Sequence, residues 1–145
     1  MLGSNIHYRW AADNDAQALV TLNDEFNGAG ITEEEVIENL SNPNELVALA
    51  LINDYPVGFA CAQLYRSICY PNPYAELTEL YIRYEARRKG IATMLVRFIE
   101  EELIRQGVKS MKVLTGKKNE AAIKTYERLS YFKEEEQLLQ KTLMS

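Results

Sequence analysis

Two apolar runs of strand length, separated by a short polar turn, constrain the fold of this chain more than any other feature. The runs are Glu45–Ile52 and residues 57–65, and Asn53-Asp54 lies between them. Continuous apolar runs of this length are typical of strands in the middle of a sheet. A third strand is expected at Tyr74–Ile82, after a loop that contains two prolines. The chain is therefore predicted to build its core around a sheet.

Helical segments precede and follow these strands along the chain. Thr32 and Glu35 form a capping box, and apolar residues recur at helical spacing over residues 90–106. The other expected elements are a strand at 6–9, helices from Asp13 or Asp15 to Phe26, at 32–40 and at 120–129, a strand at 110–114, and a last strand or hairpin at 132–142. This order predicts an α/β or α+β layer structure with a mixed sheet.

Length and composition restrict the class of protein. The 145 residues fit one domain over residues 1–145, and the net charge of −5 disfavours nucleic acid as a partner. No apolar run approaches the ~18–20 residues that span a bilayer, and no secretory signal is visible, so we expect a cytosolic protein without a membrane partner. His7 is the only histidine, and Cys61 and Cys69 match no metal or redox spacing. Neither a metal site nor a Ser-His-Asp triad is expected.

A basic, glycine-containing turn connects the third strand to the next helix. The turn reads Arg87-Arg88-Lys89-Gly90-Ile91-Ala92. The first turn of a helix has unpaired N–H groups and a partial positive charge, which together bind anions. Small residues at Gly90 and Ala92 let a pyrophosphate approach the backbone. Taken alone, this short motif is weak evidence for a phosphate site. The alternative is an ordinary strand-to-helix connection whose basic residues are solvated.

In this context the sequence resembles the GCN5-related N-acetyltransferase (GNAT) superfamily over nearly its whole length, most strongly over residues 76–132. The resemblance implies a mixed, mostly antiparallel sheet with helices on both faces, and acetyl-CoA as co-substrate without a metal. In the family the turn binds the pyrophosphate, and the preceding strand splays from its neighbour and pairs with the pantetheine arm. These roles would fall to Arg87, Arg88, Lys89, Gly90, Ile91, Ala92 and Thr93, and to Leu80, Tyr81 and Ile82. Arg88 stands where many members have glycine.

The segment after the turn supports the resemblance. Asn119, Ala122 and Tyr126, followed by Leu129-Ser130-Tyr131-Phe132, resemble the family's Asn…Ala…Tyr…Leu-Gly-Phe string. The resemblance implies that Asn119 contacts the pantetheine arm and that Tyr126 reaches the thioester sulfur. Asn119 is equally a good helix N-cap, and Tyr126 could be a packed aromatic residue. Because Ser130 replaces glycine, the turn after this helix is expected to take a different shape.

Acetyl transfer to an amine benefits from a general base and from an acid for the leaving thiolate. Glu79 is the candidate base, because a carboxylate in an apolar strand is costly unless it is paired or lies in a cleft. Strict alternation places Leu77, Glu79 and Tyr81 on one strand face. Glu76, expected on the opposite face, is the second candidate, and a salt bridge at the sheet edge is the alternative for Glu79. The phenol of Tyr126 is the candidate acid.

The acceptor is least defined by the sequence. Family acceptor contacts would come from residues 26–31 and 65–74, where aromatic residues lie near acidic ones such as Asp24, Glu25 and Glu76. This composition suits the primary amine of a small molecule, such as a polyamine, an aminoglycoside or an amino acid. The alternatives are a protein or peptide acceptor, a non-catalytic acyl-CoA-binding module, or a structural interaction domain. Many relatives are homodimers, but no feature here decides whether this chain is one.

Overall fold

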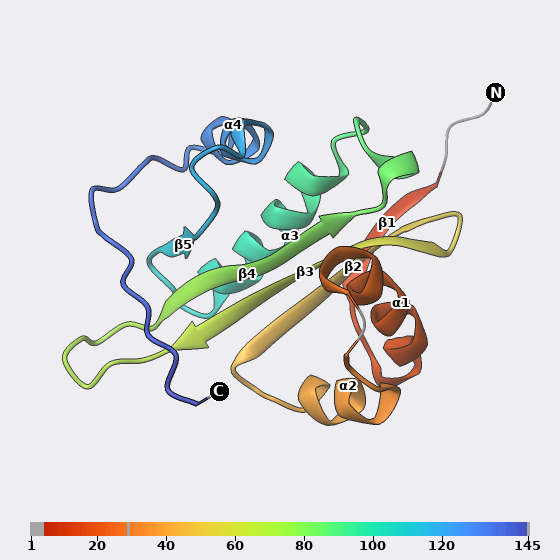
Figure 1. The fold of residues 1–145 in the computed structure, drawn as a ribbon, viewed down its shortest axis with the longest axis horizontal. Helices are drawn as coiled ribbons and strands as arrows, with labels where there is room; N and C mark the ends of the chain where they lie inside the picture. The colour runs from red at the N-terminus through yellow and green to blue at the C-terminus, as the bar shows by residue number, and fades with distance from the viewer. Residues whose placement is uncertain (1–4, 29, 145) are drawn as a thin grey trace. The chain divides into compact units, whose positions relative to one another are not determined.

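The computed structural model describes residues 5–28 and 30–144 (Figure 1). The chain forms two compact units, Met1–Leu114 and Thr115–Ser145. The first unit contains a five-stranded sheet with helices, and the second contains helix α4 (Glu120–Arg128). Among the residues described, no helix combines the length and the apolar character that crossing a membrane requires.

The sheet is mixed, as the sequence predicts, with the strands in sequence order. Antiparallel pairs join β1 to β2, β2 to β3 and β3 to β4, and β5 pairs in parallel with β4. The strands are β1 (Ile6–Trp10), β2 (Glu45–Ile52), β3 (Tyr55–Tyr65), β4 (Tyr74–Ile82) and β5 (Met111–Val113). Asn53 and Asp54 both have positive φ, which is the conformation of the tight turns whose twist matches a hairpin. The two apolar runs are central strands, since each pairs with a strand on both sides, and their continuous apolar sequence fits a sheet covered by helices on both faces.

Helices α1 (Ala16–Asn27) and α2 (Glu33–Leu40) cover one face of the sheet (Figure 1). Their buried residues join a core cluster with the strands: Ala16, Leu19, Leu22 and Val36 from the helices, and Leu49, Leu51, Phe59 and Cys61 from β2 and β3. The capping box predicted at Thr32 and Glu35 is confirmed, with hydrogen bonds of 3.1 and 3.0 Å. Before α1, the carboxylate of Asp15 accepts hydrogen bonds from Arg9 at 2.7 and 2.9 Å.

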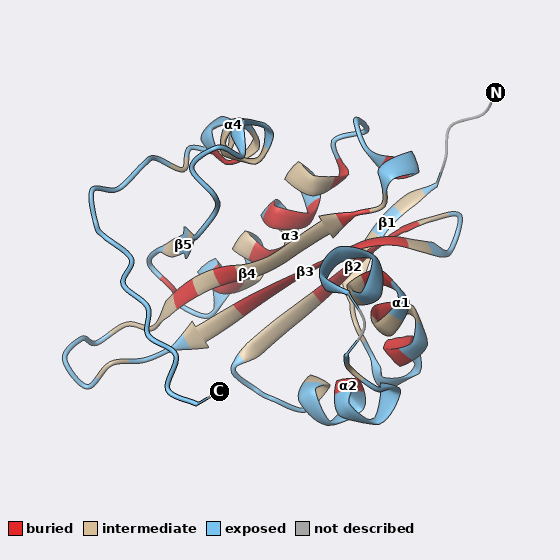
Figure 2. Cartoon of the chain, in the orientation of Figure 1, coloured by how far each residue is buried: buried red, intermediate tan, exposed pale blue. Residues whose placement is uncertain are grey.

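Helix α3 (Ile91–Arg105) covers the opposite face (Figure 1). Its apolar residues Leu95, Val96 and Ile99 are completely buried, and α3 carries red, buried segments in Figure 2. The ring of Phe98 packs on Trp10 of β1 with their centroids 4.6 Å apart. The core therefore consists of two layers, one on each side of the sheet, and the predicted arrangement of helices on both faces is confirmed.

The predicted last strand or hairpin at 132–142 is wrong, because this segment has no regular secondary structure. Its sequence has three consecutive glutamates, Glu134 to Glu136, followed by the adjacent pair Leu138-Leu139. Such a pattern does not alternate with a period of two, so no single face of a strand could be buried. Phe132, Leu138 and Leu139 are accordingly exposed.

Candidate active site

A β-bulge in β4 determines which side chains share a face with Glu79. Glu79 lies opposite Cys61 of β3, whereas Ala62, the next residue of β3, lies opposite Leu77. Thr78 is therefore an extra residue in β4, and its hydroxyl donates to the carbonyl of Cys61 at 3.2 Å. An extra residue reverses the alternation of side chains beyond it. The prediction that Leu77 and Glu79 share a face is therefore wrong.

The same bulge corrects the position of Glu76. Glu76 lies opposite Gln63, which is two residues along β3 from Cys61 and so shares its face. Glu76 and Glu79 consequently lie on the same face of the sheet, and the prediction that they face opposite ways is wrong. Glu45 of β2 lies opposite Gln63 as well, so it also belongs to this face, the one that α1 and α2 cover.

The carboxylate of Glu79 accepts a hydrogen bond from the side-chain amide of Asn27, the last residue of α1, at 3.2 Å. No ion pair of Glu79 is found among the described residues, so the salt-bridge alternative receives no support.

Burial, followed by the negative charges of Glu45 and Glu79, raises the pKa of the Cys61 thiol well above its usual value. Burial and the charge of Glu79 also raise the pKa of the Glu45 carboxyl. A thiol held protonated is a poor nucleophile, so Glu79 is the better candidate for chemistry on this face.

One edge of the second half of β4 pairs with no other strand of the described chain. Within the described chain, β5 pairs only with residues 75–77 of β4, so the two strands separate after that point. The N–H of Arg83 donates to the carbonyl of Val57 at 2.8 Å. Antiparallel alternation then directs the N–H and C=O groups of Leu80 and Ile82 away from β3, into the space beyond the end of β5. Leu80 and Ile82 are two of the three residues predicted to pair with the pantetheine arm, and the Ile82 carbonyl already accepts a hydrogen bond from Arg87. The N–H and C=O of the third, Tyr81, point toward β3 instead.

The turn after β4 leads to the N-terminus of a helix that has no side-chain cap, so this helix start follows the unpaired edge closely along the chain. A short 3-10 helix, Tyr84–Ala86, leads to Arg88 and Gly90, whose φ values are 65° and 77°. Helix α3 then begins at Ile91 without a side-chain cap and without an acidic residue in its first turn. Its first N–H groups are thus available to an anion, and the exposed residues Arg88 and Lys89 add positive charge.

Arg87 differs from its two basic neighbours because its guanidinium folds back onto β4. Its Nε donates to the carbonyl of Ile82 at 2.9 Å, and its guanidinium carbon lies 5.9 Å from the ring centroid of Tyr81 and 5.7 Å from that of Tyr84. This contact holds the end of β4 against the turn. Its predicted role in binding the pyrophosphate stays a prediction.

An ion-paired cluster connects α1 to the end of β4. The guanidinium of Arg83 donates to both oxygens of Glu25, at 3.1 and 2.5 Å, and to the hydroxyl of Tyr55 at 2.7 Å. The hydroxyl of Tyr81 donates to Glu25 at 3.0 Å. The hydrogen bond from Arg83 holds the pKa of the Glu25 carboxyl below its usual value. The negative charge of Glu25 is therefore neutralised by Arg83, so Glu25 is less suited to binding a cationic acceptor than the sequence suggested.

The second unit contains the other two predicted site residues. The side-chain oxygen of Asn119 accepts a hydrogen bond from the N–H of Ala122 at 3.3 Å, so the N-cap interpretation is correct. Tyr126 is buried in α4, and burial raises the pKa of its phenol. Its ring packs edge-on against Tyr131 at 5.8 Å. Both residues thus have structural contacts, and their catalytic roles stay predictions.

The turn after α4 keeps the shape that glycine would give. Ser130 has a φ of 72°, in the left-handed region. Its N–H donates to the carbonyl of Glu127 and that of Tyr131 donates to Tyr126, both at 3.0 Å. This pair of hydrogen bonds is the Schellman motif that commonly ends a helix. The expectation that serine changes the shape of this turn is therefore wrong.

In the segment 65–74, where acceptor contacts were expected, the aromatic side chains pack against one another and against β5. In the loop between β3 and β4, the ring of Tyr74 lies 6.4 Å from that of Tyr65 and 5.6 Å from that of Tyr70. The ammonium of Lys112 lies 5.8 Å from the ring centroid of Tyr65. These contacts support the alternative that the loop tyrosines pack on the domain. In the segment 26–31, Ala29 lies outside the described residues.

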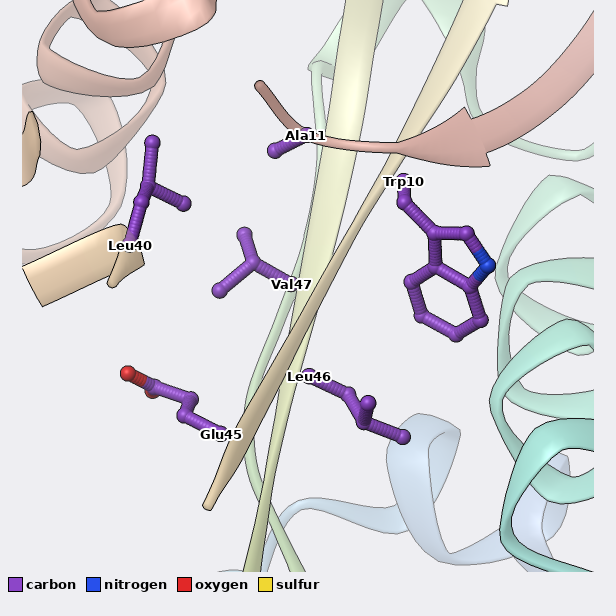
Figure 3. Close-up of a pocket in the computed structure, with 6 residues that line it drawn as sticks. All are labelled: Trp10, Ala11, Leu40, Glu45, Leu46 and Val47. Carbon is purple, nitrogen blue, oxygen red and sulfur yellow. The ribbon is translucent and has the colours of Figure 1, made fainter. Parts of the chain in front are cut away.

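A small cavity of about 140 Å³ lies between β1, β2 and the end of α2 (Figure 3). Glu45 and Val47 point to one side of β2 and Leu46 to the other. Glu45 pairs with Gln63 of β3, and Gln63 pairs with Glu76 in the first half of β4. The basic turn, in contrast, follows the other end of β4. The cavity is thus at the other end of the sheet from the turn, and it is smaller than the ~300–1,000 Å³ of ordinary ligand pockets.

Asn27 was not identified by sequence reasoning, and neither was the role of Arg83. Nothing in the local sequence marks either residue, because their partners Glu79 and Glu25 lie more than fifty residues away. The only usable signal is position: Asn27 ends the first helix and lies within residues 26–31, one of the two segments predicted to contact the acceptor.

A comparison with models of protein families identifies the class of this protein. The model of the Acetyltransferase (GNAT) family matches residues 10–131. The chain therefore belongs to the GNAT family of acetyltransferases and is an N-acetyltransferase of that class. No curated protein matches the chain significantly.

Solved structures share the fold at low sequence identity. An aminoglycoside acetyltransferase from an uncultured soil metagenomic sample has a TM-score of 0.85 and 18% identity, with 97% of each chain covered. The aminoglycoside N-acetyltransferase AAC(6')-Iy, in complex with CoA, has a TM-score of 0.84 and 17% identity over 99% of this chain and 98% of that one. A ribosomal-protein-alanine N-acetyltransferase from Brucella melitensis biovar Abortus 2308 has a TM-score of 0.81 and 14% identity, over 95% and 100%.

Proposed function

We propose that this protein transfers the acetyl group of acetyl-CoA directly to a primary amine of a small molecule, within a ternary complex. One observation carries the proposal. The edge of β4 at Leu80 and Ile82 pairs with no strand of the described chain, although the Ile82 carbonyl accepts from Arg87, and the uncapped N-terminus of α3 follows after one short turn. An extended amide-containing arm pairs with such an edge, and a pyrophosphate binds at such a helix start. Both features of a CoA site are thus consecutive in the chain.

The pyrophosphate would be bound by the N–H groups of Ile91, Ala92 and Thr93, with charge supplied by Arg88 and Lys89. The first turn of α3 contains no acidic residue to oppose this. Gly90 lies at a φ of 77° with nothing within 4 Å of an added Cβ, so it keeps the approach to the helix open. The CoA bound to the related AAC(6')-Iy supports the same class of co-substrate here.

Glu79 would act as the general base, directly or through a water molecule. The amine nitrogen attacks the thioester carbonyl, the C–N bond forms, and the amine proton passes to Glu79. The C–S bond then breaks, and the CoA thiolate takes a proton, so the products are an amide and free CoA. We assign that proton to Tyr126 on the resemblance of its motif, and the raised pKa of its phenol keeps it protonated at neutral pH.

The charge around Glu79 favours a cationic acceptor. The bulge brings Glu45 and Glu76 to the same face as Glu79, and the chain carries a net charge of −5. Two of the related structures are aminoglycoside acetyltransferases, which acetylate polycationic small molecules. A protein N-terminus is the second candidate, and the likeness to a ribosomal-protein-alanine N-acetyltransferase favours it.

The two units are proposed to form one acetyltransferase domain over residues 1–145. The support is the family model, whose match over residues 10–131 runs through the boundary at Leu114 and Thr115. The alternative to an enzyme is a non-catalytic acyl-CoA-binding module. Such a module would bind acetyl-CoA without transferring its acetyl group, so a turnover assay distinguishes the two.

Thiol release from acetyl-CoA, measured across polyamines, aminoglycosides, amino acids and peptides, tests the function. A small-molecule amine should give turnover, and Glu79→Gln should reduce kcat by about 100-fold, the lower end for a general base. Tyr126→Phe should reduce kcat as well, while Glu34→Gln and Tyr8→Phe serve as matched controls on an exposed helix and on β1. Tight CoA binding without turnover on any amine would identify a binding module instead. Full turnover in both Glu79→Gln and Tyr126→Phe would refute the catalytic assignment.

A further inference from the structure

The last turn of α1 is attached to the second half of β4. Phe26 stacks on Tyr81 with a centroid distance of 5.2 Å and an interplanar angle of 22°. Glu25 binds Arg83 and the hydroxyl of Tyr81. The side chain of Arg83 is only 18% exposed, so this ion pair is better shielded than most surface pairs. These contacts fix the end of α1 relative to the strand that carries Glu79.

Asn27 extends this attachment to the candidate base itself. Its Nδ2 donates to Oε1 of Glu79 at 3.2 Å and to the side-chain oxygen of Asn23, one helical turn earlier, at 2.8 Å. The second hydrogen bond orients the amide, because turning it over would place its oxygen against the oxygens of Asn23 and Glu79. No hydrogen bond to Oε2 of Glu79 is found among the described residues, so that oxygen is left for the reacting amine.

The charged residues that share the face of Glu79 on β2 and β4 are acidic, and Lys112 of β5 lies beside Glu76. Glu45 faces Glu79 from β2, and Glu76 shares its face on β4. The buried Cys61 thiol opposite Glu79 on β3 is uncharged. Like charges of this kind push a flexible carboxylate toward solvent. The N–H of Asn27 is the donor that the structure provides to hold Glu79 in one place.

We propose that Asn27 is a positioning residue for acetyl transfer, holding the carboxylate of Glu79 through Oε1 while Asn23 orients its amide. The proposal rests on the assignment of Glu79 as the base. It also explains how the end of α1, where the expected acceptor segment 26–31 begins, is connected to the candidate base. Asn27 touches neither acetyl-CoA nor the amine in this role and acts only through Glu79.

A double-mutant cycle between Asn27→Leu and Glu79→Gln tests the proposal. Leucine has nearly the shape of asparagine but no donor. In the wild-type background Asn27→Leu should reduce kcat about tenfold and leave the KM for acetyl-CoA unchanged, because the cofactor edge of β4 is not altered. In the Glu79→Gln background the same substitution should cause no further loss, since a base that is absent cannot be misplaced. Asn39→Leu on α2 is the matched control for an exposed helical asparagine and should keep wild-type turnover.

A second readout separates positioning from a general loss of structure. Asn27→Asp replaces the donor by another carboxylate beside Glu79, so the acidic limb of the pH profile of kcat/KM should move to higher pH. A purely structural defect would lower the profile without moving it. Additive losses in the cycle, or a profile that does not move, would overturn the role of Asn27 alone. Full turnover in Glu79→Gln would overturn the base assignment together with it.

Discussion

Among the glycines that the structure describes, Gly58 is the one where an added carbon should disturb the fold most. It lies in β3 opposite Ile82, at the end of β4 that carries the proposed cofactor edge. A Cβ at this position would lie 2.6 Å from Cδ1 of Ile82 and 2.7 Å from the carbonyl oxygen of Tyr81. The Ile82 side chain can change its rotamer, whereas the carbonyl belongs to the main chain and cannot move without the strand.

The size of the effect follows from this geometry. Ordinary Cβ contacts begin near 3.4 Å, so β4 would have to shift by about 0.7 Å at Tyr81. Overpacking of a close-packed interior typically costs about 1–3 kcal/mol, and a clash with the main chain belongs in the upper half of that range. Gly58→Ala should therefore lower the free energy of unfolding by about 2–3 kcal/mol. At roughly 3 °C per kcal/mol for a chain of this size, Tm should fall by about 6–9 °C.

Urea denaturation followed by circular dichroism measures the loss, and initial rates at varied acetyl-CoA test its functional consequence. A shift of Tyr81 displaces the neighbouring backbone groups of β4, so the KM for acetyl-CoA should rise about tenfold. Gly116→Ala is the matched control, because nothing lies within 4 Å of its added Cβ and its stability should not fall. If the two variants are equally stable, the close approach at Gly58 does not exist and the reasoning fails.

Three further predictions concern stability and thiol chemistry. The pKa of the buried Asp15 is lowered chiefly by its hydrogen bonds from Arg9, so its ionised form favours folding. Its contribution is therefore complete above the unfolded value of ~3.9 and is lost as pH falls through the lower folded value. Asp15→Asn should cost about 2 kcal/mol in urea denaturation at pH 7, and an equal cost at pH 2 would contradict the pairing. Ser130→Gly should raise the free energy of unfolding by about 0.5 kcal/mol, because glycine relieves the positive φ but has more entropy to lose; a decrease would argue against strain there. A thiol reagent should label the exposed Cys69 in the native protein and reach Cys61 only after denaturation, and rapid native labelling of both would contradict the burial of Cys61.

Elements whose ends are marked by local chemistry could be predicted from the sequence. The bounds of β2 and β4 agree with the expectation at both ends, because a turn or a proline-containing loop adjoins each apolar run. Helix α2 begins where the capping box indicates. In each case the residues that end the element lie within it or next to it. Such boundaries depend on the local chain, so a single sequence contains them.

The arrangement around Glu79 could not be predicted in the same way. The bulge at Thr78 is set by pairing with β3, some seventeen residues earlier, and threonine is as good a strand former as any neighbour. Strict alternation was the best available assumption, and it gave the wrong face for Leu77 and for Glu76. The contacts of Glu79 with Asn27, and of Arg83 with Glu25, likewise depend on how α1 packs on the sheet. The sequence thus pointed to Glu79 as the candidate base but not to its surroundings.

Two departures from the family motif show what a missing glycine changes. Arg88 and Ser130 stand where glycine is usual, yet both have positive φ, 65° and 72°. A side chain in this conformation costs roughly 1–2 kcal/mol. At Ser130 the two hydrogen bonds that end α4 would be lost if the residue left that conformation, and two such bonds are worth about as much or more. The shape of the turn is therefore determined by the carbonyl groups at the helix end, and glycine only lowers its cost. A mismatch at such a position predicts reduced stability rather than a different backbone, which is why the motif could be used to locate this turn even though its glycine is absent.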